Sequence, residues 1–242
     1  MIFLAIDTSG QEAGAAIVDK YITIGEIRLN ARTGEKTWTH SEILMPGVEQ
    51  LFSLVRLSPS CVDYVAYACG PGSFTGLRIG AAVALGMARA LGKPAIPVPT
   101  LDAMAFNLFR GGGAATIIPM LDARRGQVYT AFYERDADGQ IERVSEHMAL
   151  SAQDVLKEIP PENRQPIIFL GDGAGVNKEL LLEGIPGAIF ASPNNNRQRA
   201  ASVGVWAAEQ INAGVVFPDK VDLLYVRAPQ AVREAAARGG GI

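Results

Sequence analysis

The residues best suited to chemistry lie in CGPGSFTGLRIG, residues 69–80, where glycines separate a predicted strand from a predicted helix. Such glycines let the backbone turn tightly and expose free amides, and the helix start adds a partial positive charge, so an anion can bind there. The spacing fits neither standard phosphate loop, since G-x-G-x-x-G requires glycine where Thr75 stands and a Walker A loop requires a lysine. A tight turn with Thr75 as N-cap is the favoured interpretation, and a phosphate site stays open.

A carboxylate, Asp7, ends the first predicted strand in IDTSG, residues 6–10. It can hold a water or a magnesium ion beside phosphates, and it can equally cap a solvated turn. Thr8 and Ser9 separate it from Gly10, whereas a working nucleotide turn normally has a closer glycine. The candidate residues of a phosphate-loop-like turn are therefore Asp7, Gly70, Gly72, Ser73, Thr75 and Gly76.

Other catalytic signals are weak. The two histidines, His40 and His147, lie in no metal-binding spacing, and no G-x-S-x-G elbow offers a nucleophile. Asp102, Asp122 and Asp172 each follow a predicted strand without an obvious charged partner, so they are interpreted as turn residues. The sequence therefore predicts no catalytic residue and no metal site.

The net charge and the aromatic content argue against a protein that binds a polyanion without a partner. The formal net charge is 22 − 25 = −3, and aromatic residues that would stack on bases make up 7% of the chain. Local basic spots are interpreted as solvated surface, with contact to a phosphate in an assembled complex left open. They are Arg124 and Arg125, Arg197 and Arg199, and Arg227 and Arg233.

The elements that position these residues repeat along the chain. Three strands, a helix, a strand, a helix and a strand precede Gly111-Gly112-Gly113, and the same order follows, with LAIDTSGQ echoed by PMLDARRGQ. This duplicated β-β-β-α-β-α layout predicts an α/β, actin-like fold of two ribonuclease-H-like halves. Residues 1–110 form the first half, and residues 111–242 form the second, whose last helix and tail are expected to pack back on the first.

The two helices of the first half predict a partner surface. LRIGAAVALGMARALG, residues 77–92, is rich in glycine and alanine, which tolerate close approach by another backbone. Helical spacing places Arg78, Ala82, Leu85 and Arg89 on one stripe, while Ile79, Val83 and Ala90 suit the sheet side. The preceding helix, SEILMPGVEQLFSLVRL, is predicted from the capping-box spacing of Thr39 and Glu42 and carries Pro46 inside it. Its candidate contacts are His40, Met45 and Phe52.

The cysteines and the N-terminus fit a reduced, cytoplasmic protein. Cys61 and Cys69 flank one predicted strand, roughly 26 Å apart, so they are interpreted as reduced strand residues rather than a disulfide. Met1 leads straight into IFLAID without a basic region, and the apolar run from Gly80 to Leu91 is too short to cross a bilayer.

Several of these segments together closely resemble the TsaB (YeaZ) family. The resemblance rests on IDTSG, HSEILMPGVEQLF and GPGSFTGLRIGAAVALGMARALG in the first half, and more loosely on DARRGQVY, GDGA and YVR in the second. In relatives a proline usually stands before that tyrosine, where this chain has Leu224.

The resemblance implies an actin-like fold with an incomplete nucleotide site, in a non-catalytic partner subunit that binds its paralogue through the two first-half helices. That paralogue, TsaD, carries a metal and transfers threonylcarbamoyl to adenosine 37 of tRNA, and a small ATPase, TsaE, joins them. It also implies that tRNA is reached only through the complex and that no cofactor binds the chain alone, while binding of ATP or ADP within the complex stays open. A homodimer through the same helices stays open for the free chain.

Two other functional classes remain as alternatives. One is an autonomous actin-fold ATPase or small-molecule kinase, against which the altered Asp7 turn and the lysine-free loop argue. The other is a protease, against which the absence of a triad or metal spacing argues.

Overall fold

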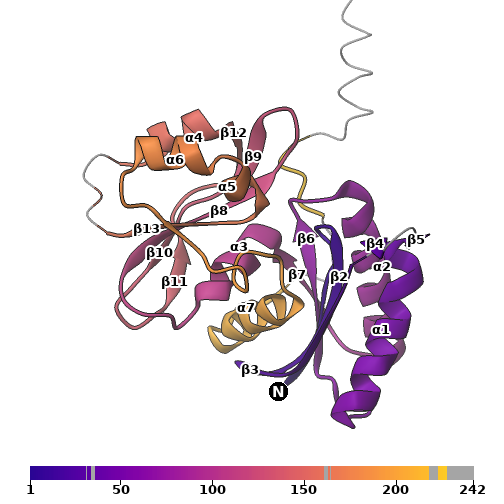
Figure 1. Ribbon diagram of the computed structural model, residues 1–242. Coiled ribbons are helices and arrows are strands. Elements are labelled where there is room, and N and C mark those ends of the chain that lie inside the picture. The colour runs from indigo at the N-terminus through magenta and orange to yellow at the C-terminus, as the bar shows by residue number, and fades with distance from the viewer. Residues whose placement is uncertain (31, 34–35, 161–162, 164, 218–222, 228–242) are drawn as a thin grey trace, which may run out of the picture.

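The structure is a computed structural model that describes residues 1–30, 32–33, 36–160, 163, 165–217 and 223–227 (Figure 1). Arg233 and the final RGGGI lie outside the described residues. Within them, two sheets stand side by side, each covered by helices. The expected α/β architecture with two sheet-based halves is confirmed.

The first sheet has the order β3-β2-β1-β6-β7, in which β1 pairs antiparallel with β2 and parallel with β6. A capping box starts the first helix as predicted, because the Glu42 carboxylate accepts the backbone N–H of Thr39 at 2.7 Å. The elements of this half are β1 (Ile2–Asp7), β2 (Glu12–Asp19), β3 (Ile22–Asn30), β4 (Arg32–Thr33), β5 (Lys36–Thr37), α1 (His40–Val55), η1 (Pro59–Cys61), β6 (Tyr64–Gly70), α2 (Phe74–Leu91) and β7 (Ala95–Pro99).

The second sheet repeats this plan. Strand β8 pairs parallel with β13 as β1 pairs with β6, and β13 pairs parallel with β14 as β6 pairs with β7. The remaining elements are α3 (Thr100–Ala105), η2 (Phe106–Leu108), β8 (Ala115–Asp122), β9 (Gln127–Thr130), β10 (Tyr133–Arg135), β11 (Ile141–Arg143), β12 (Met148–Ser151), α4 (Ala152–Glu158), β13 (Ile167–Leu170), α5 (Asp172–Val176), α6 (Lys178–Gly184), β14 (Ile189–Phe190) and α7 (Ala200–Asn212).

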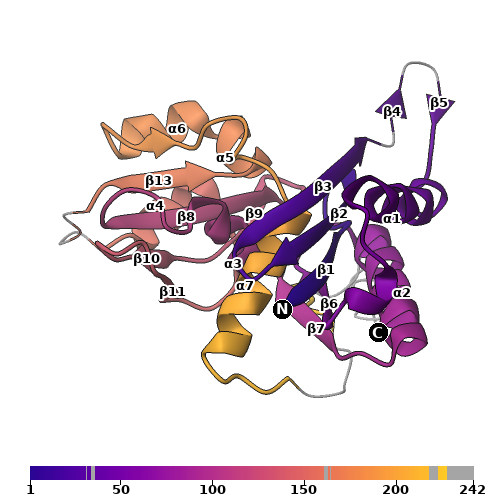
Figure 2. The same ribbon diagram turned by 90° about the horizontal axis from the view of Figure 1, so that it is seen from below.

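Strand β1 is buried on both faces, which explains its uninterrupted apolar run. Leu4 and Ile6 pack in the cluster that includes α1 and α2, whereas Phe3 and Ala5 pack in the cluster that includes α7. Helix α3 packs on the second sheet, where Leu101 meets Ile117 and its neighbours. Figures 1 and 2 show α3 and α7 lying between the two sheets, so each half supplies a helix to the space between them.

Several boundary predictions are wrong. Ser73, not Thr75, is the N-cap of α2, and its Oγ accepts the Gly76 N–H at 3.2 Å. The duplicated element order predicts that the second half opens with three strands, as the first does. Its second and third segments, residues 128–136 and 141–150, instead each divide in two, because β9 pairs with β12 and β10 pairs with β11. Cys61 is exposed in η1 rather than in a strand, whereas Cys69 is buried at the end of β6, and both thiols are free.

Helix α2 is longer than the run from Gly80 to Leu91 and, over Phe74–Leu91, meets the length and mean hydropathy of a membrane span. Its buried face, which includes Leu77, Ala81 and Ala84, instead packs on the first sheet. One such helix is weak evidence, and the core helix of a globular fold meets the same criteria. The cytoplasmic location stays a prediction.

Candidate functional site

Asp7, at the end of β1, is a buried carboxylate with one oxygen left without a partner. Its Oδ1 accepts the backbone N–H and the hydroxyl of Ser9, at 2.9 and 2.6 Å. Its Oδ2 is buried and has no hydrogen-bond partner in the part of the chain that the structure describes. Burial raises the pKa of Asp7, and the hydrogen bonds from Ser9 oppose this shift. The free oxygen is suited to a cation or a hydrogen-bond donor.

A cleft of about 320 Å³ opens beside Asp7 between the two halves. Arg197 reaches across it to form an ion pair with Glu12, so that arginine is already neutralised. The cleft is lined by Asp7, Gly10, Gln11, Glu12, Gly14, Arg28, Asn30, Asp172, Asn196, Arg197, Gln198 and Ala200. This is a polar cleft built by both halves.

The glycine-rich turn, residues 69–80, packs against the turn that follows β1 and against Leu224. A Cβ on Gly76 would lie 2.0 Å from the carbonyl oxygen of Thr8, and the Thr8 hydroxyl donates to the Gly76 carbonyl at 2.7 Å. Gly70 has φ +120°, and a Cβ there would lie 2.3 Å from the carbonyl oxygen of Leu224. The Ser73 amide donates to the Ser9 carbonyl at 2.7 Å.

These contacts favour the tight-turn interpretation of residues 69–80. The glycines are needed because the first turn of α2 lies on the turn that follows β1. The amides of Ser73 and Gly76 are occupied by Ser9 and by the Ser73 hydroxyl, so they are not available to a phosphate. Thr75 is exposed on the first turn of the helix. Binding of an anion at Asp7, Gly70, Gly72, Ser73, Thr75 and Gly76 stays a prediction.

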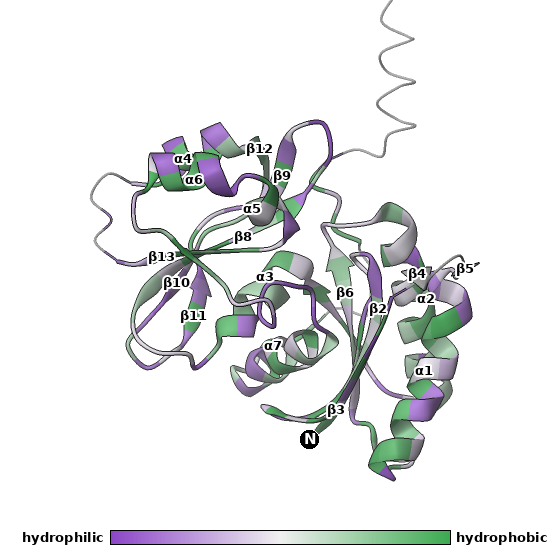
Figure 3. Cartoon of the chain, in the orientation of Figure 1, coloured by the Kyte–Doolittle hydropathy of each residue, from purple (hydrophilic) through white to green (hydrophobic). Residues whose placement is uncertain are grey.

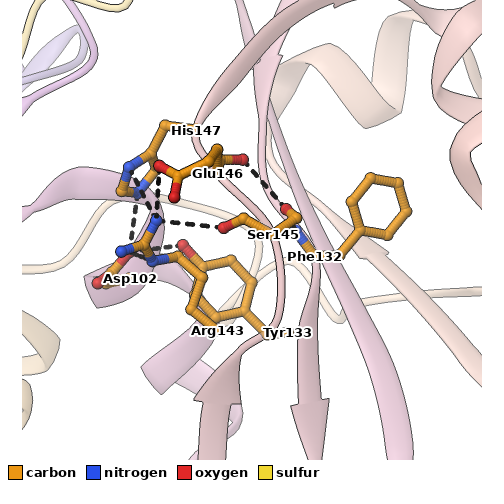
Figure 4. Close-up of polar contacts among 7 residues, drawn as sticks. All are labelled: Asp102, Phe132, Tyr133, Arg143, Ser145, Glu146 and His147. Carbon is orange, nitrogen blue, oxygen red and sulfur yellow. Dashed lines mark hydrogen bonds and ion pairs between the residues drawn. The ribbon is translucent and has the colours of Figure 1, made fainter.

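A second polar cluster was missed from the sequence (Figure 4). Asp102, predicted as a turn residue, lies in α3 and is buried. Its Oδ1 accepts the Tyr133 hydroxyl at 2.6 Å, lies 2.9 Å from His147 Nε2 and forms an ion pair with Arg143 at 3.7 Å. Because a carboxylate only accepts, His147 Nε2 carries the proton. Tyr133 and Arg143 lie on β10 and β11, so the cluster fastens α3 to the second sheet.

The cluster contains no activated nucleophile. Arg143 Nη1 lies 3.4 Å from His147 Nδ1, and the Ser145 hydroxyl donates to the Glu146 carbonyl and accepts the Phe132 amide. Burial, followed by the charge of Asp102, raises the pKa of Tyr133 well above its ordinary value. The arrangement serves to link α3 to the second sheet. Its partners stand 31 to 45 residues from Asp102, so no local spacing reveals them.

The predicted partner stripe on α2 is largely on the surface. Arg78, Ala82 and Arg89 are exposed, and Leu85 is half-buried. A Cβ on Gly86 would meet nothing within 4 Å, so the surface beside Ala82 is open. Ala90 is exposed and does not face the sheet, which corrects its predicted orientation.

On α1, Met45 is exposed, whereas the prediction of Phe52 as an exposed contact is wrong. Phe52 is 6% exposed and belongs to the core cluster of the first sheet. His40 is half-buried, with Nε2 3.3 Å from the Gln11 carbonyl. A groove of about 490 Å³ runs between the helices, lined by Met45, Pro46, Val48, Glu49, Phe52, Pro59 and Met87. Figure 3 shows hydrophobic and hydrophilic residues interspersed on α1.

No group of three or more metal-ligating side chains is found among the residues that the structure describes. His40 starts α1, and His147 lies in the Asp102 cluster, so the two histidines belong to different halves.

Comparison with known proteins places these features in a family. Residues 35–217 match the family model described as TsaD: tRNA N6-adenosine threonylcarbamoyltransferase. The chain is 32% identical over 198 residues to the tRNA threonylcarbamoyladenosine biosynthesis protein TsaB of Bacillus subtilis, covering 81% of this chain and 82% of that protein. This chain belongs to the TsaB (YeaZ) family. The Escherichia coli TsaB protein is 35% identical over 139 residues, covering 57% of this chain and 58% of its own length.

Solved structures confirm the fold of this TsaB-family chain. YeaZ from Pseudomonas aeruginosa superposes with a TM-score of 0.73 at 23% identity, covering 93% of this chain and 99% of that one. An inorganic polyphosphate/ATP-glucomannokinase from an Arthrobacter strain superposes with a TM-score of 0.50 at 15% identity, covering 88% and 99%. The actin-like fold predicted from the duplicated element order is therefore shown.

Proposed function

We propose that this chain is a non-catalytic partner subunit in the complex that transfers threonylcarbamoyl to adenosine 37 of tRNA, and that it binds and supports the catalytic paralogue TsaD. The single observation that carries the proposal is its similarity to the Bacillus subtilis TsaB protein over four fifths of both chains. The match to the TsaD family model fits a paralogue of the transferase. TsaE is the proposed third member, and tRNA is contacted within the assembly.

The exposed face of α1 and α2 is the proposed binding surface for the paralogue. Ala82 and Gly86 leave room for a second helix to approach closely, and the groove beside Met45 offers apolar surface. Arg78 and Arg89 stand at the two ends of the stripe, in the manner of a charged rim around an apolar centre. The same face serves a homodimer when the paralogue is absent.

Co-purification with the paralogue, followed by a tRNA modification assay with and without this chain, tests the proposal. The chain is expected to co-purify and to raise the rate of modification, while the chain alone modifies nothing. Normal modification by the paralogue without this chain would contradict a supporting role.

An autonomous ATPase or kinase is the second candidate, favoured by the unpartnered Asp7 oxygen in the cleft between the halves. The occupied amides of the glycine-rich turn oppose it, because they leave fewer donors for phosphates. Nucleotide hydrolysis by the isolated chain that survives purification and disappears in Asp7→Ala would establish this candidate in place of the first.

A further inference from the structure

A row of arginine and aromatic side chains crosses from the first half to the second at the end of the described chain. Residues 223–227 bridge the halves, since the Leu224 amide donates to the Cys69 carbonyl at 2.8 Å and Arg227 Nη1 donates to the Ala123 carbonyl at 3.0 Å. Figure 1 shows this segment, in yellow, running toward the β8–β9 hairpin. We call the surface the arginine ridge, and it comprises Phe74, Arg78, Arg124, Arg125, Tyr225 and Arg227.

On the first half the ridge is a cluster of three side chains in contact, Phe74, Arg78 and Tyr225. The Phe74 and Tyr225 rings lie 5.5 Å apart, the Arg78 guanidinium lies 3.8 Å from the Phe74 ring centre, and Arg78 Nε donates to the Tyr225 hydroxyl at 3.4 Å. Both rings are 38% exposed, which is unusual for large aromatic side chains with apolar surface to bury. Arg78 covers the Phe74 ring, so the exposed Tyr225 ring is the one on which a base can stack.

Arg124 and Arg125 occupy the tip of the β8–β9 turn with left-handed backbones, at φ 63° and 55°. Residues other than glycine rarely adopt this left-handed conformation, yet both of these positions in the turn are arginine. The Asp122 carboxylate accepts the Arg124 backbone N–H at 2.8 Å, so it shapes the turn. Both guanidinium groups therefore stand out from the tip into solvent.

The ridge arginines lack the charge partners that three other arginines of the chain have. Arg143, Arg197 and Arg199 form ion pairs with Asp102, Glu12 and Glu26. No ion pair within 4.0 Å involves a ridge arginine in the part of the chain that the structure describes. Asp122 and Asp172 are the acids nearest the hairpin, and they bind backbone amides.

We infer that the arginine ridge binds RNA, with the Arg124, Arg125 and Arg227 guanidinium groups on phosphates and the Tyr225 ring against an unpaired base. Arg78, at the rim of the proposed paralogue surface, stacks on Phe74 and supports Tyr225. The paired N–H donors of a guanidinium group match the oxygens of a phosphate. Exposed aromatic rings among these arginines favour unstacked bases over an acidic peptide as the ligand. The net charge of −3 is no obstacle, because the positive charge is concentrated on the ridge. The identity of the RNA as a tRNA rests on the proposed function, whereas the contact itself rests on the ridge.

The test is fluorescence anisotropy of the full chain with an RNA hairpin of about 17 nucleotides carrying an unpaired loop, titrated at several salt concentrations. Arg124→Gln/Arg125→Gln/Arg227→Gln is expected to weaken binding roughly tenfold and to reduce the salt slope by about 2, because each single-strand phosphate contact contributes ~0.7. Tyr225→Leu is expected to weaken binding with no change in slope, since stacking releases no counterions. Arg124→Gln/Arg125→Gln is the second variant, and it keeps the Arg227 contact to Ala123.

Lys20→Gln/Arg56→Gln is the matched control, because these cations also sit at left-handed positions, φ 51° and 56°, away from the ridge. It is expected to bind RNA like the unaltered chain. Equal affinity and slope in the control and in the two arginine variants, absence of RNA binding at low salt, or equal competition by polyglutamate would each overturn the inference. Pull-down of the paralogue by the ridge variants should be normal, and its loss in them alone would place the ridge in the paralogue interface and overturn the inference. Failure of the unaltered chain to pull down the paralogue would count against the proposed function instead.

Discussion

Replacing Asp102 with asparagine tests whether the buried cluster fastens α3 to the second sheet. The variant keeps the shape of the side chain but removes the charge that Tyr133, His147 and Arg143 face at 2.6, 2.9 and 3.7 Å. Hydrogen bonds to charged groups contribute about 1.5–3 kcal/mol each, and neutral ones about half of that. Weakening two such bonds and leaving Arg143 without its carboxylate is therefore expected to lower the free energy of unfolding by about 2–4 kcal/mol.

Thermal unfolding followed by circular dichroism measures this effect. For a chain of this length about 1 kcal/mol corresponds to roughly 2–4 °C, so the melting temperature should fall by about 5–10 °C. Asp138→Asn is the control, because Asp138 is exposed in the turn before β11, and it should shift the melting temperature by less than about 2 °C. A fall in Asp102→Asn no larger than in the control would refute the role of the cluster.

The alkaline titration of Tyr133 gives an independent readout. Burial is the first cause of its raised pKa and the Asp102 charge the second, so Asp102→Asn should lower that pKa while leaving it above the ordinary value. With a raised folded-state pKa, Tyr133 stabilises the fold below pH 10, and this stability is lost as pH rises further. An unchanged titration would show that the carboxylate does not act on this phenol.

Three further predictions follow from single contacts. Asp7→Asn should raise the free energy of unfolding at pH 7 by about 1–3 kcal/mol, because it removes a buried charge whose Oδ2 has no partner among the described residues. Since the folded-state pKa of Asp7 is raised above 3.8, this gain should shrink as pH falls below that raised pKa and be absent below about pH 4, as equilibrium denaturation at both pH values will show. Gly76→Ala should destabilise the fold by more than about 2 kcal/mol in denaturant titrations, since a Cβ would lie 2.0 Å from the Thr8 carbonyl, whereas Gly86→Ala should be neutral or stabilising. Burial raises the pKa of Cys69 to about 12, so stability should fall between pH 9 and 12, and Cys69→Ala should flatten that fall; equal pH profiles would contradict this.

The sequence predicts most of the fold because its signals are local. Apolar strands, the Thr39–Glu42 capping box and the duplicated element order require only neighbouring residues. The division of the 128–136 and 141–150 segments was missed, because it depends on which strands pair in space. The burial of Phe52 does not follow from the sequence, because Pro46 leaves the phase of the helix open. In the structure α1 continues through Pro46 and keeps Leu44, Val48, Leu51 and Phe52 buried.

The candidate site was predicted less completely than the fold. The position of Asp7 at the end of β1 follows from the strand pattern, but its unpartnered oxygen is a property of the folded cleft. The glycines of the turn indicated close approach without saying whether a ligand or the chain itself approaches, and Thr8 proves to be the neighbour of Gly76. Asp102 was misinterpreted because all its partners are distant in sequence.

Pull-down of the catalytic paralogue by Ala82→Glu tests the central claim most directly. Ala82 is exposed on α2 beside the open surface of Gly86, so the variant should fold normally by circular dichroism. In a closely packed interface an unpaired buried carboxylate costs several kcal/mol, about 3–5, so binding should fall by more than a hundredfold. Lys93→Glu, two residues beyond the end of α2, is the charge control and should bind normally. Loss of binding in Ala82→Glu alone is the predicted result, and a folded Ala82→Glu chain that binds the paralogue as well as the unaltered chain would contradict the proposed surface.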